Sequence, residues 1–121
     1  MITISLDEGY IFDLLSISQV KMAKATEAET IKKVNASYWK LRDEIISQIG
    51  QDKFNSISLS EEYRELFKAN EKTFDLVDKA KESEGLAKEV DKSNYERYLC
   101  KVNLQKKFFD NEVSETKIGY K

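Results

Sequence analysis

The chain has 121 residues, of which 40% are apolar and 35% charged, and it contains no histidine, no proline and a single cysteine. Its 20 basic and 22 acidic residues leave a net charge of −2, without the basic surplus of a nucleic-acid binder. The lack of histidine excludes Ser-His and Cys-His nucleophiles and most zinc sites, so we expect no catalytic residue, metal or cofactor.

The composition favours one helical domain spanning residues 1–121, since turns and sheet corners usually need more glycine and proline than this chain has. Cys100 cannot form an internal disulfide, which favours a reducing compartment. No apolar run approaches the roughly 18 residues of a membrane span, and the first residues lack the basic region of a signal peptide. We therefore expect a cytoplasmic protein that contacts neither membrane nor nucleic acid.

The first six residues alternate between apolar and polar types, with Ile2, Ile4 and Leu6 separated by Thr3 and Ser5. This period of two predicts a short β-strand over 1–6. A lone strand needs a partner for its backbone groups. The partner is either the tail around 117–120 or the same strand of a second copy.

Four later segments have helical periodicity. The predicted helices span residues 8–24, 27–49, 59–82 and 87–112, with a turn at 51–58 and a tail at 114–121. Asp7 can cap the first helix, Thr26 and Glu29 form a capping box for the second, and Ser58 or Ser60 caps the third. The first two helices could also form one rod with a kink near Ala25.

The apolar positions of these helices predict how they pack. In the second helix Ile31, Val34, Tyr38, Leu41 and Ile45 are spaced three and four apart, as on a coiled-coil seam. In the fourth, the apolar stripe is expected to include Tyr95, Leu99, Val102 and Phe109. Long helices joined by short turns pack antiparallel.

Asn70 falls on the seam of the third predicted helix, between Leu66 and Phe74. Asparagine at such a position often fixes register at a cost in stability. If that is its only role, Asn70→Leu should raise the melting temperature and loosen the oligomeric state. The alternative is that Asn70 belongs to a polar pocket.

Asn94, Arg97 and Lys101 share one face of the fourth predicted helix. This face is either solvated or an anion-binding row, in which arginine supplies a planar fork and lysine a point charge. Glu62 and Glu65 form an E-x-x-E pair of the kind that holds magnesium, although solvated acidic faces are far commoner. Without histidine, Cys100 is expected to be a packed side chain.

Four motifs carry a resemblance to a known family. They are Gly9-x-x-x-Asp13-x-x-x-Ile17-x-x-Val20-Lys21, Asn70-Glu71-x-x-Phe74-Asp75-x-x-Asp78, Asn94-x-x-Arg97-x-x-x-Lys101-x-Asn103 and Glu115-x-Lys117-x-x-Tyr120. With them the chain resembles an uncharacterised bacterial family of short helical proteins that open with a strand, a turn and a helix. Tyr10, Leu14 and Tyr95 depart from that family's Glu, Lys and Asp.

The family has no activity to carry over, but the resemblance implies a set of ligand-binding residues: Asp13, Lys21, Asn70, Glu71, Asn94, Arg97 and Lys101. Polar residues on the inner side of helices favour a buried network or a small polar pocket.

Together these patterns predict a mostly α fold of antiparallel helical hairpins, a bundle of three or four helices with one short N-terminal β-strand. We expect a non-enzymatic interaction or scaffold protein that self-associates as a homodimer and could also bind another protein. The alternative is a binder of small anionic ligands, or an enzyme, with a polar cleft between the third and fourth helices. A magnesium-dependent nucleotide hydrolase would rest on the acidic helix alone.

Overall fold

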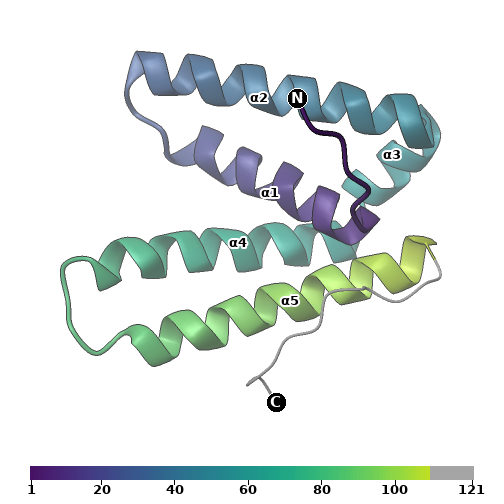
Figure 1. Cartoon of the computed structure of the whole chain (residues 1–121). Coiled ribbons are helices and arrows are strands. Elements are labelled where there is room, and N and C mark those ends of the chain that lie inside the picture. The colour runs from purple at the N-terminus through teal and green to yellow at the C-terminus, as the bar shows by residue number, and fades with distance from the viewer. Residues whose placement is uncertain (110–121) are drawn as a thin grey trace.

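Five α-helices form the part of the chain that the structure, a computed structural model, describes, which is residues 1–109 (Figure 1). They are α1 (Glu8–Lys24), α2 (Ala28–Ile49), α3 (Gln51–Ser58), α4 (Glu61–Ala80) and α5 (Ala87–Phe109). The mostly α class and the helical bundle are confirmed, with one helix more than expected. The hairpin of α1 and α2 lies beside the hairpin of α4 and α5, and α1 contacts α2, α4 and α5.

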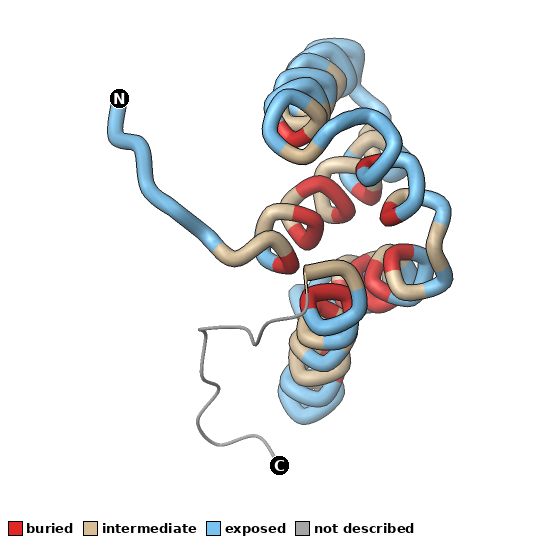
Figure 2. The backbone as a smooth tube through the Cα atoms, turned by 90° about the vertical axis from the view of Figure 1, so that its right-hand side faces the viewer, coloured by how far each residue is buried: buried red, intermediate tan, exposed pale blue. Residues whose placement is uncertain are grey.

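The predicted β-strand over 1–6 is wrong for the described chain, because residues 1–109 contain no strand. Residues 1–6, here called the N-terminal arm, instead extend away from the helices in Figure 2. Ile2 is 89% exposed and Ile4 68% exposed. Alternation alone does not make a strand without a neighbour to pair with. Of the two expected partners, the tail at 117–120 lies outside the described residues, and the other is a second copy of the chain.

The first two helices are separate, because Ala25 has an extended backbone with ψ of 137°. The predicted capping box of Thr26 and Glu29 is wrong. Glu27 occupies the N-cap of α2, and no side chain caps this end. Since the carbonyl oxygen of Glu27 accepts the N–H of Ile31 at 2.9 Å, Thr26 lies before the cap and Glu29 one position too early for the reciprocal bond.

Residues 51–58 form α3 rather than the expected turn. Gly50 ends α2 with a positive φ of 90°, and α3 begins at the next residue. Phe54 and Ile57, three residues apart, are 4% and 0% exposed. Burial of these two side chains therefore stabilises the helix. The polar residues around them make this short apolar pattern hard to recognise in the sequence.

α4 begins as one of the expected caps predicts: the Ser60 hydroxyl accepts the backbone N–H of Tyr63 at 3.1 Å. Tyr63 and Leu66 are buried, whereas Leu59, expected on the same seam, is 86% exposed. Leu59 lies before the cap, so it is off the helix face that packs inward.

The core is a cluster of apolar side chains from all five helices. It comprises Phe12, Leu15, Ile45, Phe54, Ile57, Tyr63, Leu66 and Leu104. On the seam of α2, Tyr38 and Leu41 pack against this cluster while Ile31 is 37% exposed. The seam therefore covers the bundle within one chain over its C-terminal half only. Among residues 1–109, no helix is both long and apolar enough to cross a membrane.

Candidate functional site

The inner face of α5 carries a row of polar side chains beside the apolar Leu104, which belongs to the core. Ser93, Lys101 and Gln105 are 1%, 6% and 0% exposed, and Arg97 completes a row with one residue every fourth position. Residues four apart lie above one another on a helix, so this polar row forms a single ridge against α4 and α1. The predicted apolar stripe of α5 is confirmed at Phe109, which packs against the core, and is wrong at Leu99, which is 41% exposed.

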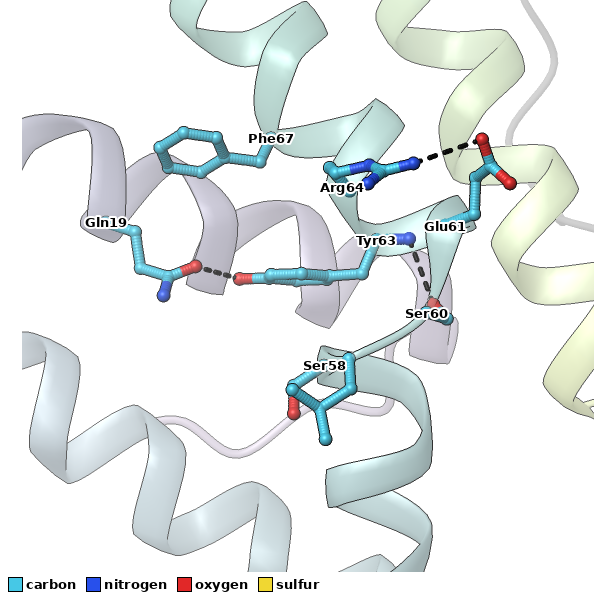
Figure 3. Close-up of a pocket in the computed structure, with 8 residues that line it drawn as sticks. Gln19, Ser58, Ser60, Glu61, Tyr63, Arg64 and Phe67 are labelled. Carbon is cyan, nitrogen blue, oxygen red and sulfur yellow. Dashed lines mark hydrogen bonds and ion pairs between the residues drawn. The ribbon is translucent and has the colours of Figure 1, made fainter.

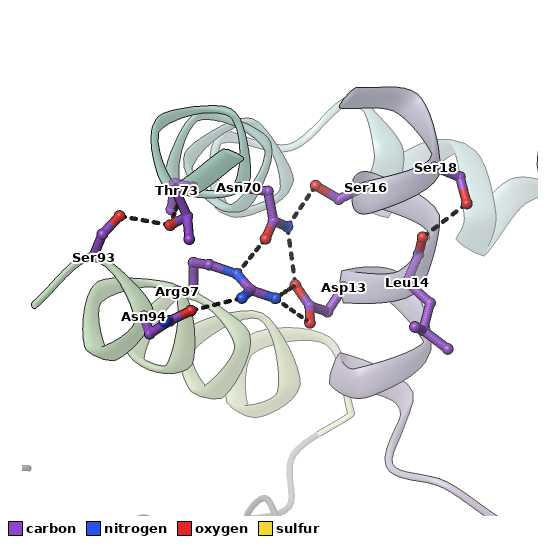
Figure 4. A network of polar contacts seen from close by, with 10 residues as sticks. Asp13, Leu14, Ser16, Ser18, Asn70, Thr73, Ser93, Asn94 and Arg97 are labelled. Atoms are coloured by element: carbon purple, nitrogen blue, oxygen red, sulfur yellow. Dashed lines mark hydrogen bonds and ion pairs between the residues drawn. The ribbon is translucent and has the colours of Figure 1, made fainter. Parts of the chain in front are cut away.

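Arg97 stands at the centre of the polar row and reaches both neighbouring helices (Figure 4). Its Nη2 donates to the Asp13 carboxylate of α1, 3.1 Å from Oδ2, and its Nη1 donates to Asn94 Oδ1 at 2.9 Å. Its Nε donates to Asn70 Oδ1 of α4. The planar guanidinium thus joins three helices through one side chain.

Asn70 uses both ends of its amide in the same network. Its Nδ2 donates to Asp13 Oδ1 and to Ser16 Oγ, each at 2.9 Å, and its Oδ1 accepts from Arg97. Asn70 is 4% exposed, Asp13 6% and Ser16 0%. Paired donors and acceptors offset the cost of burying these groups, which explains how the bundle tolerates a charged pair at its centre.

The two ends of the polar row attach to different helices. At one end the hydroxyls of Ser93 and Thr73 of α4 lie 2.5 Å apart. At the other end Gln105 Oε1 accepts the backbone N–H of Gly9 of α1 at 2.5 Å, and Gln105 Nε2 donates to Glu8 at 3.3 Å. The row therefore links α5 to α4 at its start and to α1 at its end.

Close approach of α1 to α5 requires glycine at position 9. A Cβ on Gly9 would lie 2.8 Å from the carbonyl oxygen of Lys101, nearer than side-chain carbons come to backbone atoms. The Lys101 side chain runs past two rings, with Nζ 5.2 Å from the ring centre of Tyr10 and 5.8 Å from that of Tyr98. Lysine over aromatic faces is a favourable arrangement for a buried ammonium group.

The structure brings together Asp13, Asn70, Asn94 and Arg97 of the residues implied by the resemblance, with Lys101 one turn further along α5. The other two lie elsewhere. Glu71 is 4.0 Å from Lys24 Nζ, and Lys21 is exposed near the end of α1.

Sequence reasoning assigned four members of the network to no site: Ser16, Thr73, Ser93 and Gln105. Ser16 is three residues after Asp13, and Gln105 is four after Lys101, so helical spacing from known members was the signal that could have found them.

The polar groups of this network bind one another rather than an external ligand. Among residues 1–109, every fully buried side-chain nitrogen or oxygen has a hydrogen-bond partner. The position facing Arg97, where an external anion would bind, is taken by Asp13. In the same residues no three Asp, Glu or Cys side chains lie close enough to hold a metal ion. Burial raises the pKa of the Cys100 thiol, which disfavours the nucleophilic thiolate.

An open hollow of about 550 Å³ lies between α1, the end of α3 and the start of α4 (Figure 3). Its polar side chains pair with one another: the Tyr63 hydroxyl donates to Gln19 Oε1, and Arg64 donates to Glu61 at 3.2 Å. Burial raises the pKa of Tyr63, so its phenol stays protonated. These contacts supply no pair of side chains placed to act as a general acid and a general base in the hollow.

Comparisons with known proteins returned no matching family model, no matching curated protein and no matching solved structure.

Proposed function

We propose that this protein is a non-enzymatic interaction protein that self-associates, with a second copy of the chain as its partner. The observation that carries the proposal is the unequal burial of the helices. α2 buries one of its 22 residues, Ile45, whereas α1 buries six of its 17. α2 packs on the core through one side only, by Ile45 and partly buried neighbours such as Tyr38 and Leu41, so its opposite face is available for another chain.

The side chains on α2 fit this role. Trp39, the only tryptophan, is 52% exposed, and Ile31 is 37% exposed. Tryptophan is enriched at protein interfaces, where its burial contributes much of the binding energy. The polar network supports the proposal in a different way. Its side chains hydrogen-bond to one another, so their role is to hold α1, α4 and α5 together rather than to bind a ligand.

The test is native mass spectrometry of the purified chain over a range of micromolar concentrations, which reports copy number and retained molecules together. The proposal expects a dimer whose mass is twice that of the chain. A monomer at every concentration would contradict it. A stoichiometric anionic adduct in the wild type that Arg97→Lys no longer retains would favour the anion-binding alternative instead.

A further inference from the structure

The outer surface of α2 carries a row of four exposed residues: Lys32, Ala36, Trp39 and Asp43. Their spacings of four, three and four place them along one line of the helix, as in the seam of a two-stranded coiled coil. α2 lies at the upper edge of the helical bundle in both views, opposite the edge formed by α5 (Figures 1 and 2). We call these four residues the outer row.

The outer row is complementary to itself when its direction is reversed. Read forward it is positive, small, large and negative; a second copy running the other way presents negative, large, small and positive. We propose that two copies of this chain pair through antiparallel α2 helices about a two-fold axis, with Lys32 facing Asp43 and Ala36 facing Trp39 of the second copy. This inference rests on the proposed self-association and specifies its surface.

The antiparallel arrangement pairs opposite charges and also pairs a large side chain with a small one. The indole of Trp39 meets the methyl group of Ala36 at each of two symmetric positions, so a large side chain fills the space that a small one leaves. A parallel pair would place tryptophan on tryptophan, Lys32 on Lys32 and Asp43 on Asp43, and like charges in contact disfavour association. The charge order therefore selects the direction of the second helix.

Trp39 is held in position before any partner arrives. The guanidinium of Arg42 lies 5.1 Å from the indole centre, and the Tyr38 ring meets the indole edge-on at 5.3 Å. A preordered side chain loses less entropy on binding. Arg42 also lies 3.6 Å from Asp43, whose side chain is 71% exposed and can accept a second cation from a facing lysine.

The experiment exchanges the charges of the outer row in the full-length chain. Lys32→Asp alone would place two aspartates together at each symmetric contact, and Asp43→Lys alone would place two lysines there. Each variant should dimerise about 100-fold more weakly than wild type, since the repulsion occurs twice in a two-fold dimer. An equimolar mixture of the two should form a heterodimer of near wild-type affinity, because both contacts are then Asp–Lys.

Sedimentation velocity measures these affinities, with circular dichroism to confirm that each variant is helical. The matched control is Lys88→Asp, the same charge change at an exposed position of α5, which should dimerise as wild type does. A dimeric wild type with unaffected single variants, or weakened variants whose mixture stays monomeric, would overturn this pairing while leaving self-association standing. A wild type that is monomeric throughout would overturn both.

Discussion

Replacing Asn70 with leucine tests whether the polar network stabilises the fold. The substitution keeps the branch at Cγ and the number of side-chain heavy atoms but removes hydrogen bonds to Asp13, Ser16 and Arg97, two of which involve a charged group. At about 1.5–2 kcal/mol for each charge-assisted bond and about 1 kcal/mol for the neutral one, less about 1 kcal/mol regained by leucine's apolar surface, the free energy of unfolding falls by about 3–4 kcal/mol. For a domain of this size that lowers the melting temperature by roughly 12–16 °C.

The assay is urea unfolding followed by circular dichroism, with thermal unfolding in parallel. Asn103→Leu is the matched control, because Asn103 is exposed on α5 and should change stability by less than about 0.5 kcal/mol. An unchanged or raised melting temperature for Asn70→Leu would refute this account. It would instead support the other interpretation of Asn70, that it fixes the register of the helices and lowers the stability of the fold.

Three further predictions concern other contacts of the core. Arg97→Ala should lower the free energy of unfolding by about 3–5 kcal/mol in urea, since it leaves the buried Asp13 without its counter-ion; normal stability would argue for a ligand role. Gly9→Ala should cost about 1–3 kcal/mol by the same measurement, because its Cβ would meet the Lys101 carbonyl oxygen at 2.8 Å; no loss would mean that α1 can move away from α5. Burial raises the pKa of Tyr63, so the unfolded chain releases this proton near pH 10 while the folded chain keeps it, and stability should fall as pH rises above about 10. Unfolding curves between pH 9 and 11 should show a shallower fall for Tyr63→Phe, and equal slopes would count against the burial.

The limits of the first and last described helices illustrate what periodicity predicts well. α1 has the expected bounds, and α5 begins at the expected residue, two positions after the turn glycine Gly85. The inner face of α5 was misassigned for a physical reason. Hydropathy ranks Leu99 above Ser93 and Gln105 as a core residue. The polar atoms of α1 and α4 that are buried opposite α5 need hydrogen-bond partners, however, and only polar side chains on α5 can supply them.

The missed helix and the absent strand have a common cause, since both depend on partners that one segment of sequence does not contain. α3 is held by two buried side chains, Phe54 and Ile57, within an otherwise polar stretch of eight residues. The N-terminal arm has the pattern of a strand without a paired neighbour in the described chain. Similarly, helical spacing placed Asn94, Arg97 and Lys101 on one face, but only the tertiary fold brings Asp13 to Arg97.

The emission of Trp39 tests the central claim most directly, because the chain has one tryptophan and it lies at the middle of the proposed interface. The measurement is its fluorescence spectrum over a dilution series of the wild type, at constant buffer and temperature. The account predicts emission that shifts to longer wavelength on dilution, with the midpoint at the dimer dissociation constant from sedimentation. A spectrum of exposed indole that stays unchanged while the protein passes from dimer to monomer would contradict it.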